Sequence, residues 1–314
     1  MMHFIFFRMN KATVVKSTGS WYILKDVITQ NIYEARIRGK FKKEKIRNTN
    51  PLAVGDLVDY ELENNDIAWV TKIYARKNYL IRKSVNLSKE THILASNVDL
   101  ACILFTLKKP VTSLGFLNRF LITCEAYQIP VLIIFNKIDL LSVQEMLSLN
   151  EIDLLYKNIG YDTLEISAEK KINIDILKEK IKNKTVVFSG HSGSGKTSTI
   201  NALQPQLNLK TSVISEYDDK GKHTTTFAQM YDWDFGGQII DIPGIKEFEL
   251  VDIDREELQD YFPEIFKYRE FCKFNNCLHI NEPGCAVVEA VKDNLISSKR
   301  YLHYLKLMEE LNIK

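Results

Sequence analysis

Eight consecutive residues carry the clearest chemistry in this chain of 314 residues, because they can form a loop that binds phosphate. The run Gly190-His191-Ser192-Gly193-Ser194-Gly195-Lys196-Thr197 matches the pattern Gly-x4-Gly-Lys-Ser/Thr. The glycines let backbone N–H groups approach phosphate oxygens, and the N-terminus of a following helix favours negative charge. We expect Lys196 to reach the β- and γ-phosphates of a nucleotide and Thr197 to ligate Mg²⁺. Ser198 completes the loop, and His191 is a variable position that should pack or face solvent.

A second short run, Asn136-Lys137-Ile138-Asp139, can select the base of that nucleotide. It follows the apolar run 131–135, as a loop at the end of a buried strand would. The Asp139 carboxylate can accept hydrogen bonds from the ring N–H and the exocyclic amine of guanine, a donor pair that adenine lacks. Asn136 and Lys137 would brace the loop and cover the face of the base. This run predicts guanine specificity and argues against an ATPase or a kinase.

The order of these two motifs differs from that of ordinary GTPases, in which the phosphate loop comes first. Here the guanine motif precedes the phosphate loop, which predicts a circularly permuted nucleotide-binding domain. The switch region then leads directly into the C-terminal segment. Loss of the γ-phosphate would therefore have a covalent route by which to reorient that segment.

Two weaker motifs complete the predicted nucleotide site. Ser167 and Ala168 follow a predicted strand at 163–166 and match the second base-binding loop, whose backbone N–H contacts the guanine oxygen. Asp241 ends another apolar run and begins the sequence Asp-Ile-Pro-Gly. We expect Asp241 to hold Mg²⁺ through a water molecule and the Gly244 N–H to sense the γ-phosphate.

Four residues near the C-terminus have the spacing of metal ligands: Cys272, Cys277, His279 and Cys285. Three thiolates and one imidazole are enough for a closed tetrahedral Zn²⁺ site, which would leave no position open for catalysis. We therefore predict one structural zinc ion per chain. Cys102 and Cys124 lie in an apolar strand pattern and an apolar helix pattern, so we interpret both as core residues.

The elements expected to position these residues fall into three segments. Between residues 10 and 80, five short β-like runs separated by turn signals predict a small β-barrel of the OB type. From about 95 to 250, apolar strands alternate with helical patterns, which is typical of a doubly wound α/β domain. From about 251 the chain is helical around the cysteine-rich loop, with a second amphipathic pattern over 287–311. We place the domain boundaries at 1–82, 83–250 and 251–314.

The individual elements are predicted as follows. In the barrel, the strands are 12–15, 21–24, 32–38, 57–62 and 68–73. In the α/β segment, the strands are 100–105, 131–135, 163–166, 185–189 and 239–241, and the helices are 116–127, 143–158, 175–181 and 196–203. Residues 227–233 and 238–241 should form a hairpin through Phe235-Gly236-Gly237.

Charge is distributed unevenly along the chain. The formal net charge is +2, yet residues 1–90 hold 17 Lys or Arg against 9 Asp or Glu. Residues 36–47 include seven basic side chains and a single acid, Glu44. A run this basic favours a polyanion such as RNA through phosphate neutralisation. The alternative is a solvated basic loop.

No apolar run reaches the roughly 18–20 residues that a membrane-spanning helix needs, so we expect no membrane partner. The apolar stretch 1–7 lacks the preceding basic region of a signal peptide, and either Met1 or Met9 can be the start. Five cysteines, an odd number, in a chain with a nucleotide-binding signature indicate the reducing cytoplasm. We expect a monomer.

Taken together, these motifs resemble those of the ribosome small-subunit-dependent GTPase A (RsgA) family. The matching set also includes Gly221-Lys222-His223-Thr224-Thr225-Thr226 and the helix around Arg300-Tyr301, and the resemblance covers nearly the whole chain. Asn173 stands where the family usually has Gly, and Lys222 replaces a common Arg or Gln. Neither position has a phosphate or metal role.

The resemblance implies a GTPase that acts in late maturation of the small ribosomal subunit, binds its rRNA and is stimulated by it. It also implies that Thr225 is the switch threonine that joins the Mg²⁺ shell, with its neighbours Thr224 and Thr226 left open. The position of the water-orienting glutamine of Ras-like GTPases is held by Ile245, which cannot bond to water. His223 is the internal candidate for that role, and its alternative is a contact with rRNA or packing of the loop.

The sequence thus predicts hydrolysis of GTP to GDP and phosphate, with Mg²⁺ as the cofactor and Zn²⁺ as a structural ion. The main rival is an RNA-binding scaffold in which a bound guanine nucleotide is static. A GTPase assay with and without small subunits separates the two.

Overall fold

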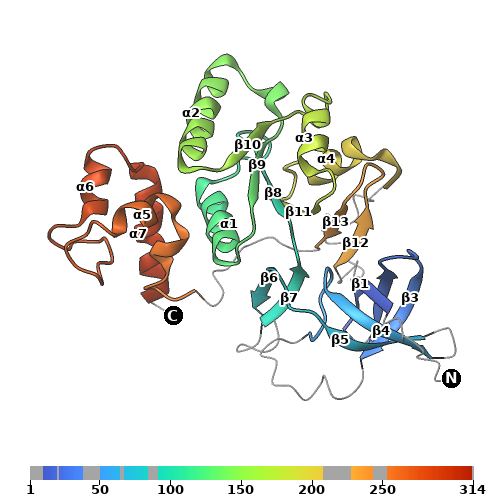
Figure 1. Ribbon diagram of the computed structural model, residues 1–314. Helices are drawn as coiled ribbons and strands as arrows, with labels where there is room; N and C mark the ends of the chain where they lie inside the picture. The colour runs from blue at the N-terminus through green and yellow to red at the C-terminus, as the bar shows by residue number, and fades with distance from the viewer. Residues whose placement is uncertain are drawn as a thin grey trace, which may run out of the picture. The chain divides into compact units, whose positions relative to one another are not determined.

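A computed structural model describes residues 10–19, 21–37, 50–63, 67–83, 91–207, 228–242 and 253–312 (Figure 1). The described chain forms two compact units. The first contains residues up to 99 together with 181–188 and 228–242, and the second contains 100–180, 189–207 and 253–312. Each unit is therefore assembled from segments that are far apart in the sequence.

The first unit contains a closed barrel of five strands: β1 (Asn10–Ser17), β2 (Tyr22–Asp26), β3 (Ile32–Ile37), β4 (Leu57–Glu63) and β5 (Ile67–Ile73). β1 pairs with both β2 and β4, and the parallel pair β3–β5 closes the circle. Alternate side chains of β2 point inward, and Val14, Leu24 and Val70 lie in the barrel core. The predicted OB-type barrel is confirmed.

A two-stranded hairpin follows the barrel, formed by β6 (Tyr79–Lys83) and β7 (Thr91–Ser96). The sequence analysis did not predict these strands. The register shifts between Leu80 and Ile81, and both of these side chains are buried. Such a bulge interrupts the alternation of buried and exposed residues by which a strand is recognised.

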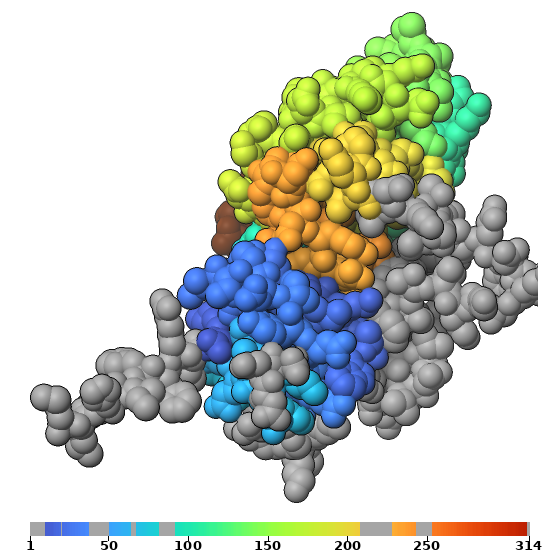
Figure 2. Space-filling model, turned by 90° about the vertical axis from the view of Figure 1, so that its right-hand side faces the viewer, coloured from blue at the N-terminus to red at the C-terminus, as the bar shows by residue number. Residues whose placement is uncertain are grey.

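Three strands from the middle of the chain complete the first unit: β11 (Thr185–Gly190), whose last two residues belong to the second unit, β12 (Gln229–Asp232) and β13 (Gln238–Asp241). β12 and β13 form the predicted hairpin, and β13 runs parallel to β11. β12 also pairs with β1 of the barrel at Gln229 and Lys16. Figure 2 shows this hairpin, in orange, against the blue surface of the barrel.

The second unit has a parallel sheet of β8 (Leu100–Phe105), β9 (Val131–Phe135) and β10 (Asp162–Glu165). All residues of β8 and β9 are buried, as expected for strands covered on both faces. Its helices are α1 (Leu114–Ala126), α2 (Val143–Ile159), α3 (Ile174–Ile181) and α4 (Lys196–Leu203), and short 3-10 turns lie at Ile138–Leu140 and Pro205–Leu207. A capping box of Ser142 and Glu145 starts α2, and Gly160 ends it with φ of 114°. These elements match the predicted α/β pattern.

The C-terminal part of the second unit consists of a 3-10 turn at Leu258–Tyr261 and the helices α5 (Pro263–Arg269), α6 (Ala286–Lys292) and α7 (Ser298–Asn312). The amphipathic pattern predicted over 287–311 is therefore two helices rather than one. The chain turns at Asn294, whose φ is 58°, a conformation that Asn tolerates better than most residues and that a helix cannot contain. Within the described residues, every helix is too short or too polar to span a bilayer.

Candidate functional site

The phosphate loop joins the end of β11 to the start of α4. Gly190, Gly193 and Gly195 all have positive φ, between 78° and 146°, which explains the need for glycine at these positions. A Cβ on Gly190 would stand 2.9 Å from the Leu104 carbonyl oxygen, and one on Gly195 would collide with the Asn136 amide. The loop therefore has the backbone conformation that lets N–H groups surround a phosphate.

Lys196, the first residue of α4, bends back over this loop. Its Nζ donates a hydrogen bond to the Gly190 carbonyl and lies 3.4 Å from the His191 carbonyl. The ammonium group is thus held above the loop, where the phosphates of a nucleotide would lie. Thr197 is half-buried beside it, while Ser192 and Ser198 are exposed.

Asn136 connects the base-binding loops to the phosphate loop. Its side chain is buried and donates through Nδ2 to the Ser194 carbonyl at 2.9 Å. Its Oδ1 accepts from the Ala168 N–H at 3.2 Å. One side chain therefore links its own loop to two others, whose bonded residues lie 32 and 58 positions further along the sequence.

Lys137 and Asp139 are also held by protein partners. The Lys137 backbone has φ of 66°, and its ammonium donates to the carbonyls of Lys109 and Gly193. The Ser167 hydroxyl donates to Asp139 Oδ1 and accepts from the Lys170 N–H. The carboxylate that would read guanine is exposed, yet its orientation is set by Ser167. The structure thus brings together the predicted base-binding residues.

Asn173, at the position where the RsgA pattern usually has Gly, shows why the exchange is tolerated. Its φ is 57°, and its side chain donates to the Glu165 carbonyl at 2.8 Å. Asn adopts the left-handed conformation more readily than other non-Gly residues. The turn after the Ser167 loop therefore keeps its shape.

Asp241 lies in the first unit, at the end of β13. Its neighbour Ile240 pairs in parallel with Val187 of β11, so Asp241 lies at the C-terminal end of this strand pair. The proposed roles of His223, Thr224, Thr225, Thr226 and Gly244 concern positions outside the described residues, as does most of the basic run 36–47.

The four predicted metal ligands form a compact group. The ligand atoms of Cys272, Cys277, His279 and Cys285 all lie within 4.8 Å of one another. Nδ1 of His279 is 3.5 Å from the Cys272 sulfur and 3.4 Å from the Cys285 sulfur. This donor set of three sulfurs and one nitrogen fits a tetrahedral ion that prefers soft ligands.

Burial raises the pKa of the Cys277 thiol to about 12 and also raises the pKa of Cys285. Burial lowers the pKa of His279. Without a cation the thiols would therefore stay protonated, whereas a metal ion would stabilise the thiolates that ligate it. The site can hold a metal ion.

Gln259 is a residue of this site that sequence analysis missed. Its Oε1 lies 2.9 Å from Nε2 of His279, which places an acceptor behind the ring and leaves Nδ1 facing the sulfurs. No local spacing links Gln259 to the cysteine loop, because it comes from the 3-10 turn that precedes α5. Only the packing of that turn against the loop reveals its role.

Comparisons with known proteins agree with this geometry. A model of the RsgA GTPase domain matches residues 73–251, and a model of the RsgA N-terminal domain matches residues 11–70. The chain is 50% identical to the small ribosomal subunit biogenesis GTPase RsgA of Flavobacterium psychrophilum, covering 94% of this chain and 91% of that protein.

The chain belongs to the RsgA GTPase family. The RsgA protein of Christiangramia forsetii is 49% identical over 95% of this chain and 96% of its own length. The crystal structure of YjeQ from Thermotoga maritima matches with a TM-score of 0.81 and 30% identity. The match covers 97% of this chain and 99% of YjeQ. The structure of YloQ, a circularly permuted GTPase, has a TM-score of 0.77 with 32% identity, and covers 99% of this chain and 98% of that one. The predicted family and the permuted fold are confirmed.

The two cysteines outside the cluster lie in the core. Cys102 in β8 and Cys124 in α1 are fully buried, so the prediction that both are core residues is confirmed. Burial raises the pKa of Cys124 well above its ordinary value, which keeps this thiol neutral.

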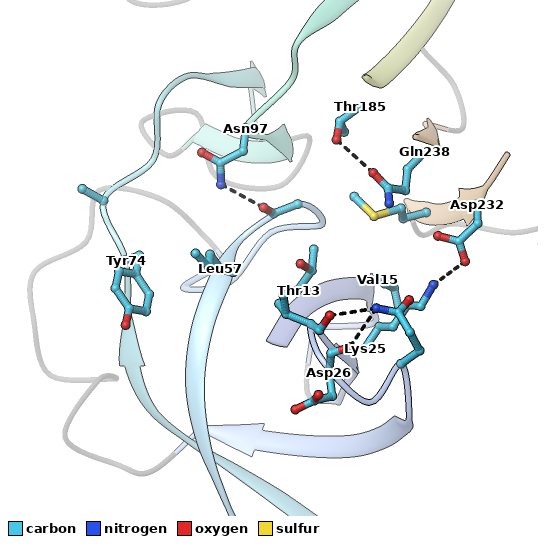
Figure 3. A pocket seen from close by; sticks show the side chains of 15 residues that line it. Thr13, Val15, Lys25, Asp26, Leu57, Tyr74, Asn97, Thr185, Asp232 and Gln238 are labelled. Atoms are coloured by element: carbon cyan, nitrogen blue, oxygen red, sulfur yellow. Dashed lines mark hydrogen bonds and ion pairs between the residues drawn. The ribbon is translucent and has the colours of Figure 1, made fainter. Parts of the chain in front are cut away.

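A cavity of about 540 Å³ lies in the first unit, between the barrel and the β12–β13 hairpin (Figure 3). None of the predicted site residues line it. Across it, Lys25 Nζ contacts Asp232 Oδ2 at 2.5 Å, and Thr185 donates to Gln238 at 3.3 Å. Lys25 and Asp232 neutralise each other, so we assign no ligand to this cavity of the RsgA relative.

Proposed function

We propose that this RsgA relative hydrolyses GTP to GDP and phosphate and acts in late maturation of the small ribosomal subunit, to whose rRNA it binds. The observation that carries the proposal is the joint placement of the guanine loop and the phosphate loop through Asn136. The relatives named as small ribosomal subunit biogenesis GTPases, at about 50% identity, supply the partner. We propose that it acts in the cytoplasm as a monomer, with domain boundaries at residues 82/83 and 250/251.

Each predicted residue has a role in this proposal. Asp139, oriented by Ser167, accepts the guanine donors, while backbone N–H groups of 190–198 and the Lys196 ammonium bind the phosphates. Mg²⁺, when bound, neutralises charge that develops on the phosphate oxygens. Thr197, Thr225 and Asp241 would hold it, Asp241 through a water molecule. Gly244 would sense the γ-phosphate.

We assign zinc to the Cys272–Cys285 group, since three sulfurs and one nitrogen favour it over harder cations. A closed set of four protein ligands leaves no position for substrate. The ion would stabilise residues 253–312 rather than take part in hydrolysis.

Catalysis requires a group that orients the attacking water, and Ile245 cannot serve. We propose that His223 does so when the small subunit is bound. The protein alone should therefore hydrolyse GTP slowly, and small subunits should accelerate the hydrolysis. His223→Ala should retain GTP and subunit binding while losing most of the stimulated turnover.

The test is steady-state GTP turnover with and without purified small subunits, compared between the unaltered protein and His223→Ala. Turnover that small subunits leave unchanged would favour the scaffold alternative. If small subunits stimulate His223→Ala as strongly as the unaltered protein, the catalytic group belongs to another residue or to the ribosome.

The basic run supports the rRNA half of the proposal. Replacing Lys40, Lys42, Lys43 and Lys45 together by Gln should flatten the salt dependence of subunit binding while GTP binding stays intact. Each lost phosphate contact should lower the log–log slope by about 0.7–0.9. An unaltered slope would mean that the run is a solvated loop.

A further inference from the structure

The first turn of α1 supports the phosphate loop. Ser113 caps this helix by accepting from the Phe116 N–H at 3.2 Å. The Phe116 ring, 8% exposed, stacks on His191 with a centroid distance of 4.0 Å and an interplanar angle of 29°. His191 is the second residue of the phosphate loop, so an aromatic side chain from α1 packs against that loop.

His191 is linked in turn to the residue that binds phosphate. Its carbonyl accepts from the Ser194 N–H at 3.0 Å and lies 3.4 Å from Nζ of Lys196. Burial lowers the pKa of His191, and the Lys196 charge adds to the effect. The imidazole is therefore neutral at pH 7 and packs as a flat ring. A shift of this ring would move the carbonyl that helps to hold Lys196.

The same turn of α1 contacts the C-terminal helix α7. A Cβ at Gly115 would stand only 3.5 Å from Cε1 of His303, so this imidazole packs directly on the α1 backbone. One turn further along, Arg300 of α7 donates to Asn118 Oδ1 at 2.7 Å. Arg119 pairs with Glu310, and Ile122 lies in the core of the C-terminal helices.

The Arg300 side chain is buried and has several partners. Arg300 is 1% exposed and binds Glu264 of α5 through Nε at 2.6 Å and through its terminal amine at 3.1 Å. The acceptor Asn118 also receives the Tyr156 hydroxyl at 2.7 Å. A buried ion pair with several hydrogen bonds holds its partners in one geometry. The segment that carries the metal cluster is thus fixed to α1.

We propose that Phe116 positions the phosphate loop by stacking on His191, and that α7 of the metal-bearing segment influences nucleotide turnover through this contact. The regulatory half rests on the proposed GTPase function. Contact between the ribosome and residues 253–312 would then reach Lys196 through packed side chains, a route separate from the covalent link after Asp241. Packed networks of this kind can carry coupling between sites.

The first experiment measures binding of fluorescent GTP and GDP without ribosomes. Phe116→Leu, which keeps an apolar side chain but removes the flat ring, should weaken the binding of both nucleotides about tenfold, the contribution of one aromatic pair. Phe116→Tyr, which keeps an aromatic ring, should bind both nucleotides as the unaltered protein does. Phe120→Leu, in the same helix and fully buried, is the matched control. It should lower the melting temperature about as much while keeping nucleotide affinity.

The second experiment is a double-mutant cycle on turnover with small subunits. His303→Ala should reduce stimulated kcat about fivefold with KM and basal turnover unchanged, as typical coupling between sites allows. In the double variant, His303→Ala should cause no loss of stimulated kcat beyond that of Phe116→Leu, because both act through one contact.

Two results would overturn the proposal. Equal loss of affinity in Phe116→Leu and Phe120→Leu would reduce Phe116 to a core residue. If the losses of stimulated kcat multiply in the double variant, α7 does not act through the phosphate loop. If small subunits fail to stimulate the unaltered protein, the proposed function fails instead. The regulatory half then fails with it, while the comparison of Phe116→Leu with Phe120→Leu, which needs no ribosomes, still decides whether Phe116 positions the phosphate loop.

Discussion

The base-binding loops and the metal cluster are both built from short motifs, but they hold their functional atoms in different ways. In the base-binding loops, Asn136, Lys137 and Asp139 are each bonded to another protein segment. In the cluster, the four ligand atoms face one another within 4.8 Å. Gln259 is the partner that reaches the His279 ring from outside the loop.

This difference separates a preorganised site from a site that a metal ion would complete. Polar side chains that already have protein partners need no reorganisation when a nucleotide binds. Three clustered sulfurs beside an imidazole, two of them buried and Cys272 half-buried, are stable as thiolates only with a cation between them. Nucleotide affinity should therefore depend on small changes in hydrogen bonding, and C-terminal stability on the metal.

Loss of the metal should have the largest effect. Cys277→Ala should abolish stoichiometric zinc and unfold residues 253–312 selectively, since structural zinc contributes about 10–16 kcal/mol in small zinc peptides. Elemental analysis and hydrogen exchange would measure the two effects. Cys124→Ala, a buried cysteine outside the cluster, should keep its zinc. Undamaged protein without zinc would contradict the assignment.

The next largest effect should come from the buried ion pair between Arg300 of α7 and Glu264 of α5. Arg300→Met leaves Glu264 buried and unpaired, which should cost about 3–5 kcal/mol of unfolding free energy in urea. Arg119→Met breaks the partly exposed pair with Glu310 and should cost below about 1 kcal/mol. Equal losses would mean that the metal loop alone holds these helices in place.

Base selection should respond less strongly. Asp139→Asn should weaken GTP binding by about 2–3 kcal/mol and favour xanthosine triphosphate, whose oxygen can pair with the amide. Calorimetry with GTP and with xanthosine triphosphate measures the change in affinity for each. Asp162→Asn, an exposed carboxylate on β10, should leave both affinities unchanged. Undiminished GTP affinity in Asp139→Asn would refute the guanine assignment.

The smallest effect tests preorganisation itself. Ser167→Ala removes the hydroxyl that orients Asp139 and should weaken GTP binding by about 1 kcal/mol, roughly fivefold. Ser142→Ala, which removes the cap of α2, should reduce stability by a similar amount without changing affinity. Identical affinities in the two variants would show that Asp139 needs no orienting partner.

Much of the architecture was predictable because it depends on local pattern. The continuous apolar runs of β8 and β9 and the start of α4 at Lys196 have the predicted bounds. Buried strands and helix starts are encoded by neighbouring residues, so short windows suffice. The permuted order of motifs and the spacing of the cysteine loop are likewise properties of the sequence alone.

The elements that were missed depend on irregularity. The β6–β7 hairpin has a bulge that places Leu80 and Ile81 on the buried side together. The helix predicted over 287–311 is broken at Asn294 by a single left-handed residue. A periodic pattern averages over both events, because each involves only one residue.

The partners of the functional residues were decided by tertiary structure. Phe116 stacks on His191, Arg300 reaches Asn118 across 182 positions, and Gln259 contacts His279. The sequence identifies the chemistry of each motif, since that chemistry belongs to residue type and spacing. Which distant side chain supports the motif follows from how helices pack around a shared core, and packing is a property of the folded chain.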